Sequence, residues 1–149
     1  MYSFVDRPVE SLSQGSRFAL WAMRRWTSAR LARTCPPHAL SPSFRGMGAL
    51  DALSPFHLAM VALNSHARVR VEVARIDRYR IGEDEAVLLA LWRDSLDPAA
   101  RPRRDATLAQ LLDIRAGIAA RLFDAAASAL AQAGLAPDGL DRDPAGEIL

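Results

Sequence analysis

Residues 82–96 read GEDEAVLLALWRDSL, and this stretch decides the fold. Three consecutive acidic residues follow Gly82, and they favour a helix start because the helix dipole is positive at that end. Residues 86–95 are apolar on nearly every side of a helix, a pattern typical of a helix buried at the centre of a protein. Asp97 and Pro98 end this helix. We therefore expect a helical protein built around this segment.

A second core helix is predicted over residues 54–66. Ser54 is a typical N-cap, and Pro55 suits the first helical position, where its missing N–H group costs nothing. Apolar residues then recur at helical spacing, so one face of this helix is expected to point into the core: Phe56, Ala59, Met60, Leu63 and Ala67.

The first helix of the chain is predicted over residues 16–33. Ser13 or Ser16 is the expected cap, and two consecutive prolines stop the helix because the residue before a proline avoids helical geometry. Residues 36–54 are expected to form a loop with a short helical turn at residues 48–53.

The C-terminal part of the chain is also predicted to be helical. Residues 98–104 are expected to form a basic loop. A helical stretch follows over residues 105–133 and ends at Gly134, a good C-cap. Gly117 is the point at which this stretch could divide into a short helix and a long one.

Residues 69–81 allow two interpretations. The alternation Val-Arg-Val-Glu-Val at residues 69–73 is typical of a half-buried strand, and Tyr79 and Ile81 could supply the second strand of a small β-hairpin. A continued helix, with Val69, Val73 and Ile76 on one face, is the alternative. The alternation favours the hairpin.

These elements predict a mainly α protein: a single compact helical domain of about five helices, with a small β-hairpin as an option at residues 69–81. The chain has 149 residues, half of them apolar, which is enough to bury the core of one domain. Residues 1–12 are expected to be a flexible leader, residues 13–136 the helical domain, and residues 137–149 a loose acidic tail.

Composition excludes several kinds of chemistry. All 19 basic residues are arginine, so there is no lysine to form a Schiff base or to bind phosphates in a P-loop. The single cysteine rules out an internal disulfide framework and fits a reducing cytoplasm. The N-terminal residues lack the pattern of a secretory signal, and no apolar run approaches the roughly 20 residues that cross a bilayer. We therefore expect a cytoplasmic protein that does not insert into membranes.

The placement of charge is the clearest indication of function. Six arginines and no acidic residue lie between Glu10 and Asp51, and a second basic stretch follows over residues 68–80. Arginine and tryptophan are enriched where proteins bind one another. We therefore predict a non-catalytic interaction or regulatory protein that binds an acidic protein partner, or a second copy of itself, through Arg17, Trp21, Arg24, Arg25, Arg30 and Arg33. A solvated face, on which arginine stems cover apolar helix edges, is the alternative reading of these residues.

A DNA-binding regulator is the main functional alternative. The stretch TLAQLLDIR, residues 107–115, resembles the opening of bacterial helix-turn-helix regulators. The resemblance implies a helix pair at residues 107–135 whose second helix lies in the major groove of DNA. Asp113 stands where such motifs have a turn glycine. The basic residues available to contact nucleic acid are Arg101, Arg103, Arg104, Arg115 and Arg121.

A small enzyme, or a metal- or haem-binding protein, is the second alternative. Cys35 and His38 have the spacing of a metal-ligand pair, and His57 and His66 could complete the set. The dipeptide Cys35-Pro36 also resembles the Cys-Pro dipeptide of haem-regulated proteins. However, the sequence contains no second closely spaced ligand pair, nucleophile elbow or phosphate loop. The sequence therefore predicts no cofactor, no metal site and no catalytic residues.

Overall fold

Helix α4 (Glu83–Ser95) forms from the stretch that decides the fold, in a computed structural model that describes residues 2–113 and 115–141. The Glu85 carboxylate accepts a hydrogen bond from the backbone N–H of Gly82 at 2.9 Å, which closes the first turn. Nine of its 13 residues are buried, and the Trp92 side chain is 0% exposed. The prediction of a central buried helix is confirmed.

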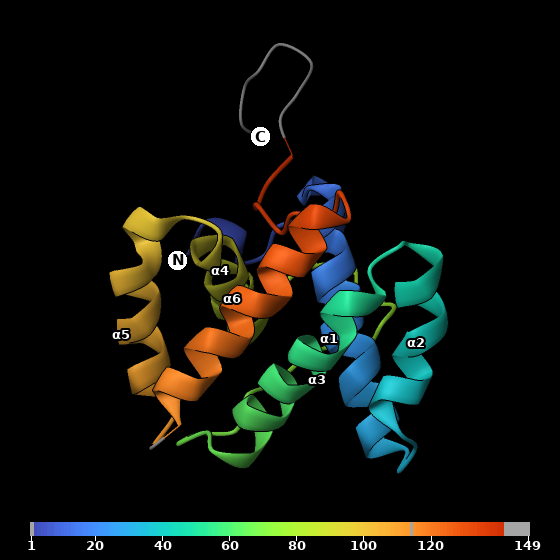
Figure 1. Ribbon diagram of the computed structural model, residues 1–149, viewed down its shortest axis with the longest axis horizontal. Helices are drawn as coiled ribbons and strands as arrows, with labels where there is room; N and C mark the ends of the chain where they lie inside the picture. Colours follow the sequence, from blue (N-terminus) through green and yellow to red (C-terminus); the bar gives the residue numbers. More distant parts are fainter. Residues whose placement is uncertain (1, 114, 142–149) are drawn as a thin grey trace.

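Five further α-helices complete the fold (Figure 1): α1 (Gln14–Leu31), α2 (Pro36–Gly46), α3 (Leu50–Ser65), α5 (Arg101–Leu111) and α6 (Ala116–Gln132). Helix α6 packs against α3, α4 and α5, whereas α1 contacts α2, α3 and α4. The fold is 68% helix, with no strand among the described residues. This confirms the predicted mainly α, single compact domain, with six helices in place of about five. In the described ranges, no helix is both long and apolar enough to cross a membrane.

A row of aromatic rings runs through the core and connects four helices. Phe44 of α2 lies 5.7 Å from Phe56 of α3, measured between ring centroids. Phe56 stacks on Trp92 of α4 at 5.5 Å, and Trp92 lies 4.2 Å from Phe123 of α6. The indole N–H of Trp92 donates to the sulfur of Met23 at 3.4 Å, so the polar atom of the buried ring has a partner.

Residues 36–54, predicted as a loop with a short helical turn at residues 48–53, contain helix α2 and the start of α3. The predicted turn overlaps the first residues of α3. The sequence predicts only that Pro36 stops α1. This residue also occupies the first position of α2, where proline is tolerated. Gly48 has φ +69°, and this left-handed glycine ends α2 and lets α3 follow after a short turn. Pro55, predicted to begin a helix, therefore lies inside α3, because the apolar residues before it reach the core.

The prediction of a basic loop at residues 98–104 is also wrong. These residues form a single 3-10 turn, Pro98–Ala100, and the first turn of α5. Helix α5 ends at Leu111, ahead of the predicted division at Gly117. The next residue, Leu112, is extended and fully buried, and the backbone N–H of Arg68 donates to the carbonyl of Leu111 at 2.8 Å. Tertiary contacts, not a glycine, end this helix.

Two predicted helix caps are confirmed. Ser13 is the N-cap of α1, and its hydroxyl accepts a hydrogen bond from the backbone N–H of Ser16 at 3.2 Å. Gly134 follows the end of α6 with φ +80°. The backbone N–H of Leu135 then donates to the carbonyl of Leu130 at 2.8 Å, which satisfies an end-of-helix carbonyl.

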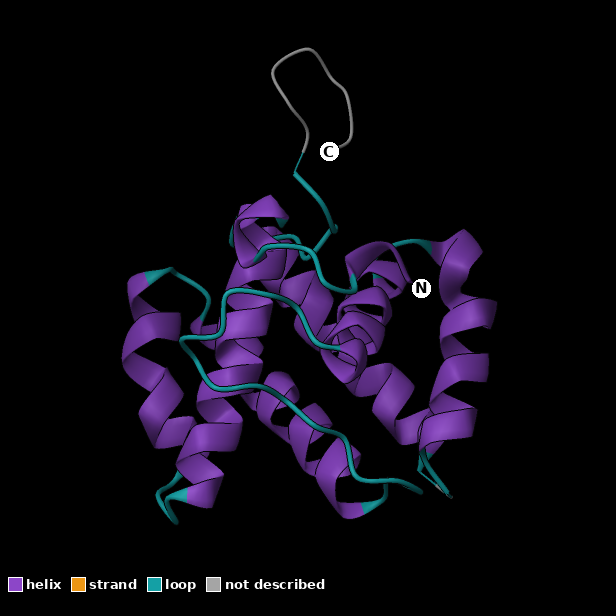
Figure 2. Ribbon diagram, turned by 180° about the vertical axis from the view of Figure 1, so that it is seen from behind, coloured by secondary structure: helices purple, strands orange, loops and turns teal. Residues whose placement is uncertain are grey.

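Residues 67–81, which we call the strap, form neither the predicted β-hairpin nor the alternative helix. They cross one face of the bundle as a long loop, turn, and return to the start of α4 (Figure 2). The second arm bonds to the N-terminal segment: Ile81 donates to the carbonyl of Arg7 at 3.0 Å, and Val9 donates to the carbonyl of Tyr79 at 2.9 Å. The hairpin does not close because the N-terminal segment occupies that arm.

The two ends of the described chain lie together. Phe4 and Leu12, within the predicted flexible leader, are buried in the core. The backbone N–H of Ser13 donates to the carbonyl of Gly139 at 2.8 Å, so the first residues of the predicted loose tail pack beside the start of α1. The rest of that predicted tail, residues 142–149, lies outside the described residues.

Candidate protein-interaction groove

A buried ion pair between Arg24 of α1 and Glu85 of α4 holds the strap in place. The Nε and Nη2 atoms of Arg24 lie 2.7 and 3.0 Å from the two carboxylate oxygens of Glu85, and the side chains are 3% and 1% exposed. Arg24 also donates to the strap carbonyls of Arg78 and Arg80, at 2.7 and 3.2 Å. One guanidinium thus joins two helices to the strap.

The Glu85 carboxylate is also bound by backbone groups. It accepts hydrogen bonds from the N–H of Gly82 at 2.9 Å and the N–H of Ala74 at 3.0 Å. Burial raises the pKa of Glu85, but the hydrogen bonds from Arg24, Gly82 and Ala74 outweigh burial and hold this pKa below its ordinary value. The carboxylate therefore stays ionised at neutral pH and anchors the strap to α4.

A hollow, which we call the basic groove, lies between the strap and the C-terminal half of α1. Its volume is about 630 Å³, and its lining comprises Thr27, Arg30, Leu31, Arg33, Asn64, Arg70, Val71, Glu72 and Val73. A smaller hollow of about 340 Å³ shares part of this lining and extends to Ile76. The strap and the C-terminal half of α1 therefore supply most of the lining of both hollows.

The basic groove has an excess of positive charge. Three arginines and one acidic residue, Glu72, line it. Within the part of the chain that the structure describes, no carboxylate lies within ion-pairing distance of Arg30, Arg33 or Arg70. The Arg30 guanidinium lies 5.8 Å from the ring centre of Trp26. These guanidinium groups can bind carboxylates of another molecule in a bidentate manner.

Apolar side chains lie exposed beside these arginines. Leu31 of α1 is 71% exposed, and Val69 and Ile76 of the strap are 73% and 44% exposed. Exposed apolar side chains rimmed by charged groups are typical of surfaces that bind other proteins. The groove therefore combines apolar contact area with the means to recognise negative charge.

Arg33 adopts a backbone conformation that usually requires glycine. It follows the last turn of α1 with φ +58°, and the N–H of Thr34 donates to the carbonyl of Ala29 at 2.9 Å. A non-glycine residue in this region costs on the order of 1 kcal/mol. Strain of this kind is concentrated at functional sites, so the presence of arginine here supports a role for its side chain.

The structure brings together part of the predicted partner-binding surface. Arg30 and Arg33 line the groove. Arg24 does not belong to any exposed surface, a correction that follows from its burial in the ion pair with Glu85. The other three predicted residues lie outside the groove lining: Arg17 is exposed, and Trp21 and Arg25 are partly buried.

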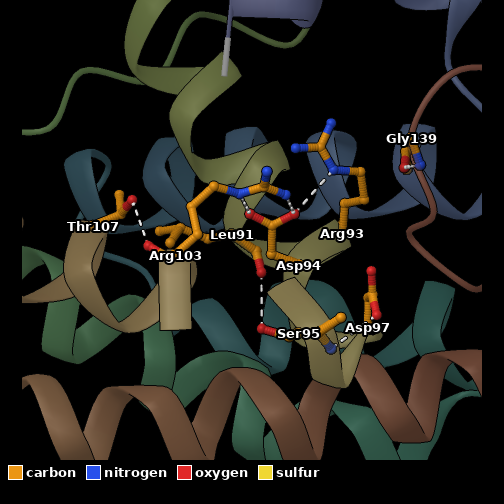
Figure 3. A network of polar contacts seen from close by, with 10 residues as sticks. Leu91, Arg93, Asp94, Ser95, Asp97, Arg103, Thr107 and Gly139 are labelled. Carbon is orange, nitrogen blue, oxygen red and sulfur yellow. Dashed lines mark hydrogen bonds and ion pairs between the residues drawn. The ribbon is translucent and has the colours of Figure 1, made fainter. Parts of the chain in front are cut away.

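Asp94 of α4 engages one of the arginines that we predicted as nucleic-acid contacts. Arg103 donates to both of its carboxylate oxygens, at 2.7 and 3.0 Å, and Arg93 donates at 3.1 Å (Figure 3). Burial raises the pKa of Asp94, but the hydrogen bonds from Arg103 and Arg93 outweigh burial and lower it. Arg103 therefore fastens α5 to α4.

The remaining predicted nucleic-acid contacts are dispersed. Arg104 is 3% exposed, and it binds Asp124 of α6 and the hydroxyl of Ser95, the latter at 3.1 Å. The Nε atom of Arg101 lies 3.8 Å from Asp124. Helix α6, which a helix-turn-helix would place in the DNA groove, is also the helix packed on α3, α4 and α5. Two exposed arginines of this set belong to this part of the chain: Arg115, the N-cap of α6, and Arg121 within the helix.

Cys35 and His38, whose spacing is that of a metal-ligand pair, are exposed at the start of α2. In the described ranges, no group of three histidine, cysteine or acidic side chains is placed to hold a metal ion. His57 has a different role, because its Nδ1 accepts a hydrogen bond from the indole N–H of Trp26 at 2.9 Å. Burial lowers the pKa of His57, which favours the neutral imidazole that this bond requires.

The sequence predicts one wall of the groove but not the other. Arg30 and Arg33 belong to the predicted contacts, whereas Arg70 is predicted only as part of a second basic stretch. The signal for the strap was the alternation at residues 69–73, which predicts a strand but not its neighbour. Which segment lies beside the strap depends on the long-range contacts of Arg24 and Glu85.

Comparison of the chain with protein-family models, with curated proteins and with solved structures finds no match. A function has therefore to be inferred from the groove itself.

Proposed function

We propose that this chain is a non-catalytic protein-interaction domain whose basic groove binds an acidic segment of a partner protein. The observation that carries the proposal is the set of three exposed arginines, Arg30, Arg33 and Arg70, around one hollow that also has an apolar lining. Guanidinium groups without an internal carboxylate partner favour a ligand that brings carboxylates. The apolar lining can contact apolar side chains of a protein segment, which a free inorganic anion does not have.

The DNA-binding alternative has less support. Arg103 and Arg104 are engaged with Asp94 and Asp124, so their charges are already balanced inside the molecule. Arg101 is exposed but lies 3.8 Å from Asp124. Arg115 and Arg121 are then the exposed arginines of the predicted set that have no carboxylate within ion-pairing distance among the described residues. Two such side chains give only a weak contribution from phosphate neutralisation, because that contribution grows with the number of phosphates contacted.

The proposal is tested by charge reversal within the groove. The probe is a fluorescent eight-residue peptide in which glutamate alternates with valine, titrated with the protein at low salt. We expect the double variant Arg30→Glu/Arg33→Glu to weaken binding at least tenfold, because two guanidinium contacts become repulsive. Binding by the unaltered protein should also fall as salt is raised.

The matched control is Arg17→Glu/Arg45→Glu, which changes the net charge by the same amount at exposed positions outside the groove lining. We expect the dissociation constant of the peptide to stay within about twofold of that of the unaltered protein, because solvent and salt screen distant exposed charges. If the unaltered protein does not bind the peptide, or if both double variants lose binding equally, the groove is not the site and the proposal fails.

A further inference from the structure

Residues 70–75 of the strap contain no helix, turn or bend, and we interpret them as a single extended strand without a neighbouring strand. Side-chain exposure alternates at the start of this run: Arg70 and Glu72 are exposed, whereas Val71 and Val73 are partly buried against the core. This is the pattern of a strand with one face on the bundle and one face in solvent.

One edge of this strand is already occupied. The backbone N–H of Glu72 donates to the carboxylate of Asp84 at 2.7 Å, and the N–H of Ala74 donates to Glu85 at 3.0 Å. Both acceptors belong to the first turn of α4. Two carboxylates therefore take the place that a neighbouring strand would have on this edge.

The other edge is open. Successive N–H groups of an extended chain point to opposite edges, so those of Val71 and Val73 point away from α4. Among the described residues, the backbone N–H and carbonyl groups of Val71 and Val73 make no hydrogen bond. Both residues line the basic groove, so the open edge runs along it. An unpaired edge of this kind is a template for pairing with another extended chain.

We propose that the partner segment binds in the basic groove as an added β-strand, paired with the backbone of Val71 and Val73. This inference rests on the proposed function and specifies its ligand: an extended peptide in which acidic and apolar residues alternate. Its apolar side chains would lie over the bundle beside Val71, Val73 and Leu31. Its acidic side chains would face Arg70 across the ribbon and the arginines at the end of α1.

A second copy of the chain is a less suitable occupant. Antiparallel pairing of two straps around Val71 would set Arg70 of each copy opposite Glu72 of the other, which is favourable. The same pairing would bring together two grooves that each carry Arg30 and Arg33 without a carboxylate partner among the described residues. Like charges in one desolvated interface are costly, so an acidic peptide fits the groove better.

The experiment uses the alternating glutamate–valine peptide in three forms: unmodified, N-methylated on two central valines, and N-methylated on two central glutamates. Methylation removes N–H donors from one edge of the bound strand only. We expect one methylated form to lose binding at least tenfold and the other to bind within about threefold of the unmodified peptide. The form that loses binding identifies the strand direction, valine for antiparallel and glutamate for parallel pairing.

Amide hydrogen exchange on the full chain provides the second readout. Peptide binding should slow exchange at Val71 and Val73 at least tenfold and leave Glu72 and Ala74 nearly unchanged, because their N–H groups are already bonded. Equal loss, or no loss, with both methylated peptides would overturn strand addition while leaving groove binding intact. A protein that dimerises without peptide and protects the same two amides would assign the open edge to a second copy instead, and would also overturn the proposal.

Discussion

At the scale of single residues, the pair formed by Arg24 and Glu85 decides where the strap lies. The Arg24 guanidinium donates hydrogen bonds to the Glu85 carboxylate and to the carbonyls of Arg78 and Arg80. Glu85 also accepts a hydrogen bond from the backbone N–H of Ala74. Both charges are removed from water, so each depends on the other for its stabilisation. The open edge of the strap and the wall of the groove both follow from this pair.

Loss of the Glu85 charge should destabilise the protein strongly. We expect Glu85→Gln to lower the free energy of unfolding by about 3–5 kcal/mol, because it leaves the Arg24 guanidinium buried without a counter-charge. Urea denaturation followed by circular dichroism measures the change. The control is Glu83→Gln in the same helical turn, which is exposed and should change stability by less than about 0.5 kcal/mol. Equal effects of the two substitutions would contradict the role of the buried pair.

Substitution of Arg33 by glycine should increase stability and weaken peptide binding. We expect Arg33→Gly to raise the free energy of unfolding by about 0.5–1 kcal/mol, because glycine adopts φ +58° without strain. The same substitution should weaken binding of the acidic peptide, because it removes a groove arginine. The comparison variant is Arg30→Gly, which should lose both binding and stability, since Arg30 lies within helix α1. A less stable Arg33→Gly protein would show that the backbone there is not strained.

At the scale of elements, polar contacts rather than loop sequences set how α4, α5 and α6 meet. Asp94 of α4 binds Arg103 of α5, and Arg104 on the next position binds Asp124 of α6. Neighbouring arginines on one helix thus point to two different helices. This arrangement explains why an arginine-rich stretch that resembles a basic loop in sequence forms the first turn of a helix.

The two neighbouring arginines should differ in their contribution to stability. We expect Arg104→Met to cost about 2–3 kcal/mol, because Arg104 is 3% exposed while its partner Asp124 retains some contact with solvent. Arg103→Met should cost less than Arg104→Met, because the Arg103 side chain is 64% exposed and the buried Asp94 keeps its hydrogen bond from Arg93. Thermal unfolding of both variants, side by side, tests the order. A larger loss for Arg103→Met would contradict this assignment.

At the scale of the whole molecule, three ionisable groups give stability the same dependence on pH. The pKa values of Glu85, Asp94 and His57 are all lower in the folded protein than their ordinary values. The unfolded chain then holds each proton more tightly, so the free energy of unfolding rises with pH across each titration. The contributions of Glu85 and Asp94 to the free energy of unfolding are fully present above their ordinary pKa values of 4.5 and 3.8. They are lost as pH falls through the lower pKa values of the folded protein.

His57 should account for the part of this dependence nearest neutrality. As pH falls below its ordinary pKa of 6.5, protonation of the unfolded state competes with the hydrogen bond that neutral Nδ1 accepts from Trp26. We expect stability measured by urea midpoint to decline between pH 7 and pH 5, and His57→Gln to flatten that decline. The decline below pH 4.5 should remain in the variant, because it belongs to the carboxylates. An unaltered slope above pH 5 in His57→Gln would contradict the assignment.

Much of the fold could be predicted from local patterns. Gly82 and the acids after it, Ser13 and Gly134 each carry a cap signal that acts within one helical turn. The start of α3 could not be found in this way, because Pro55 carries a start signal that the turn at Gly48 overrides. One wall of the groove could be predicted from a local pattern, because α1 has the periodicity of a helix. The alternation in the strap predicts a strand, but it does not indicate which segment lies beside that strand.

The sequence by itself determined that this protein is helical, that residues 82–96 are its centre, and that its basic residues are all arginine, six of them in the acid-free stretch between Glu10 and Asp51. These properties depend on hydrophobic periodicity and on caps, which act between near neighbours in the chain. Only the tertiary structure decided which arginines are available. Arg24 meets a carboxylate 61 residues away and is buried. Arg30 on the same helix and Arg33 just after its end meet no carboxylate among the described residues and line the groove. Such long-range pairing depends on how the helices pack, and no local pattern encodes it.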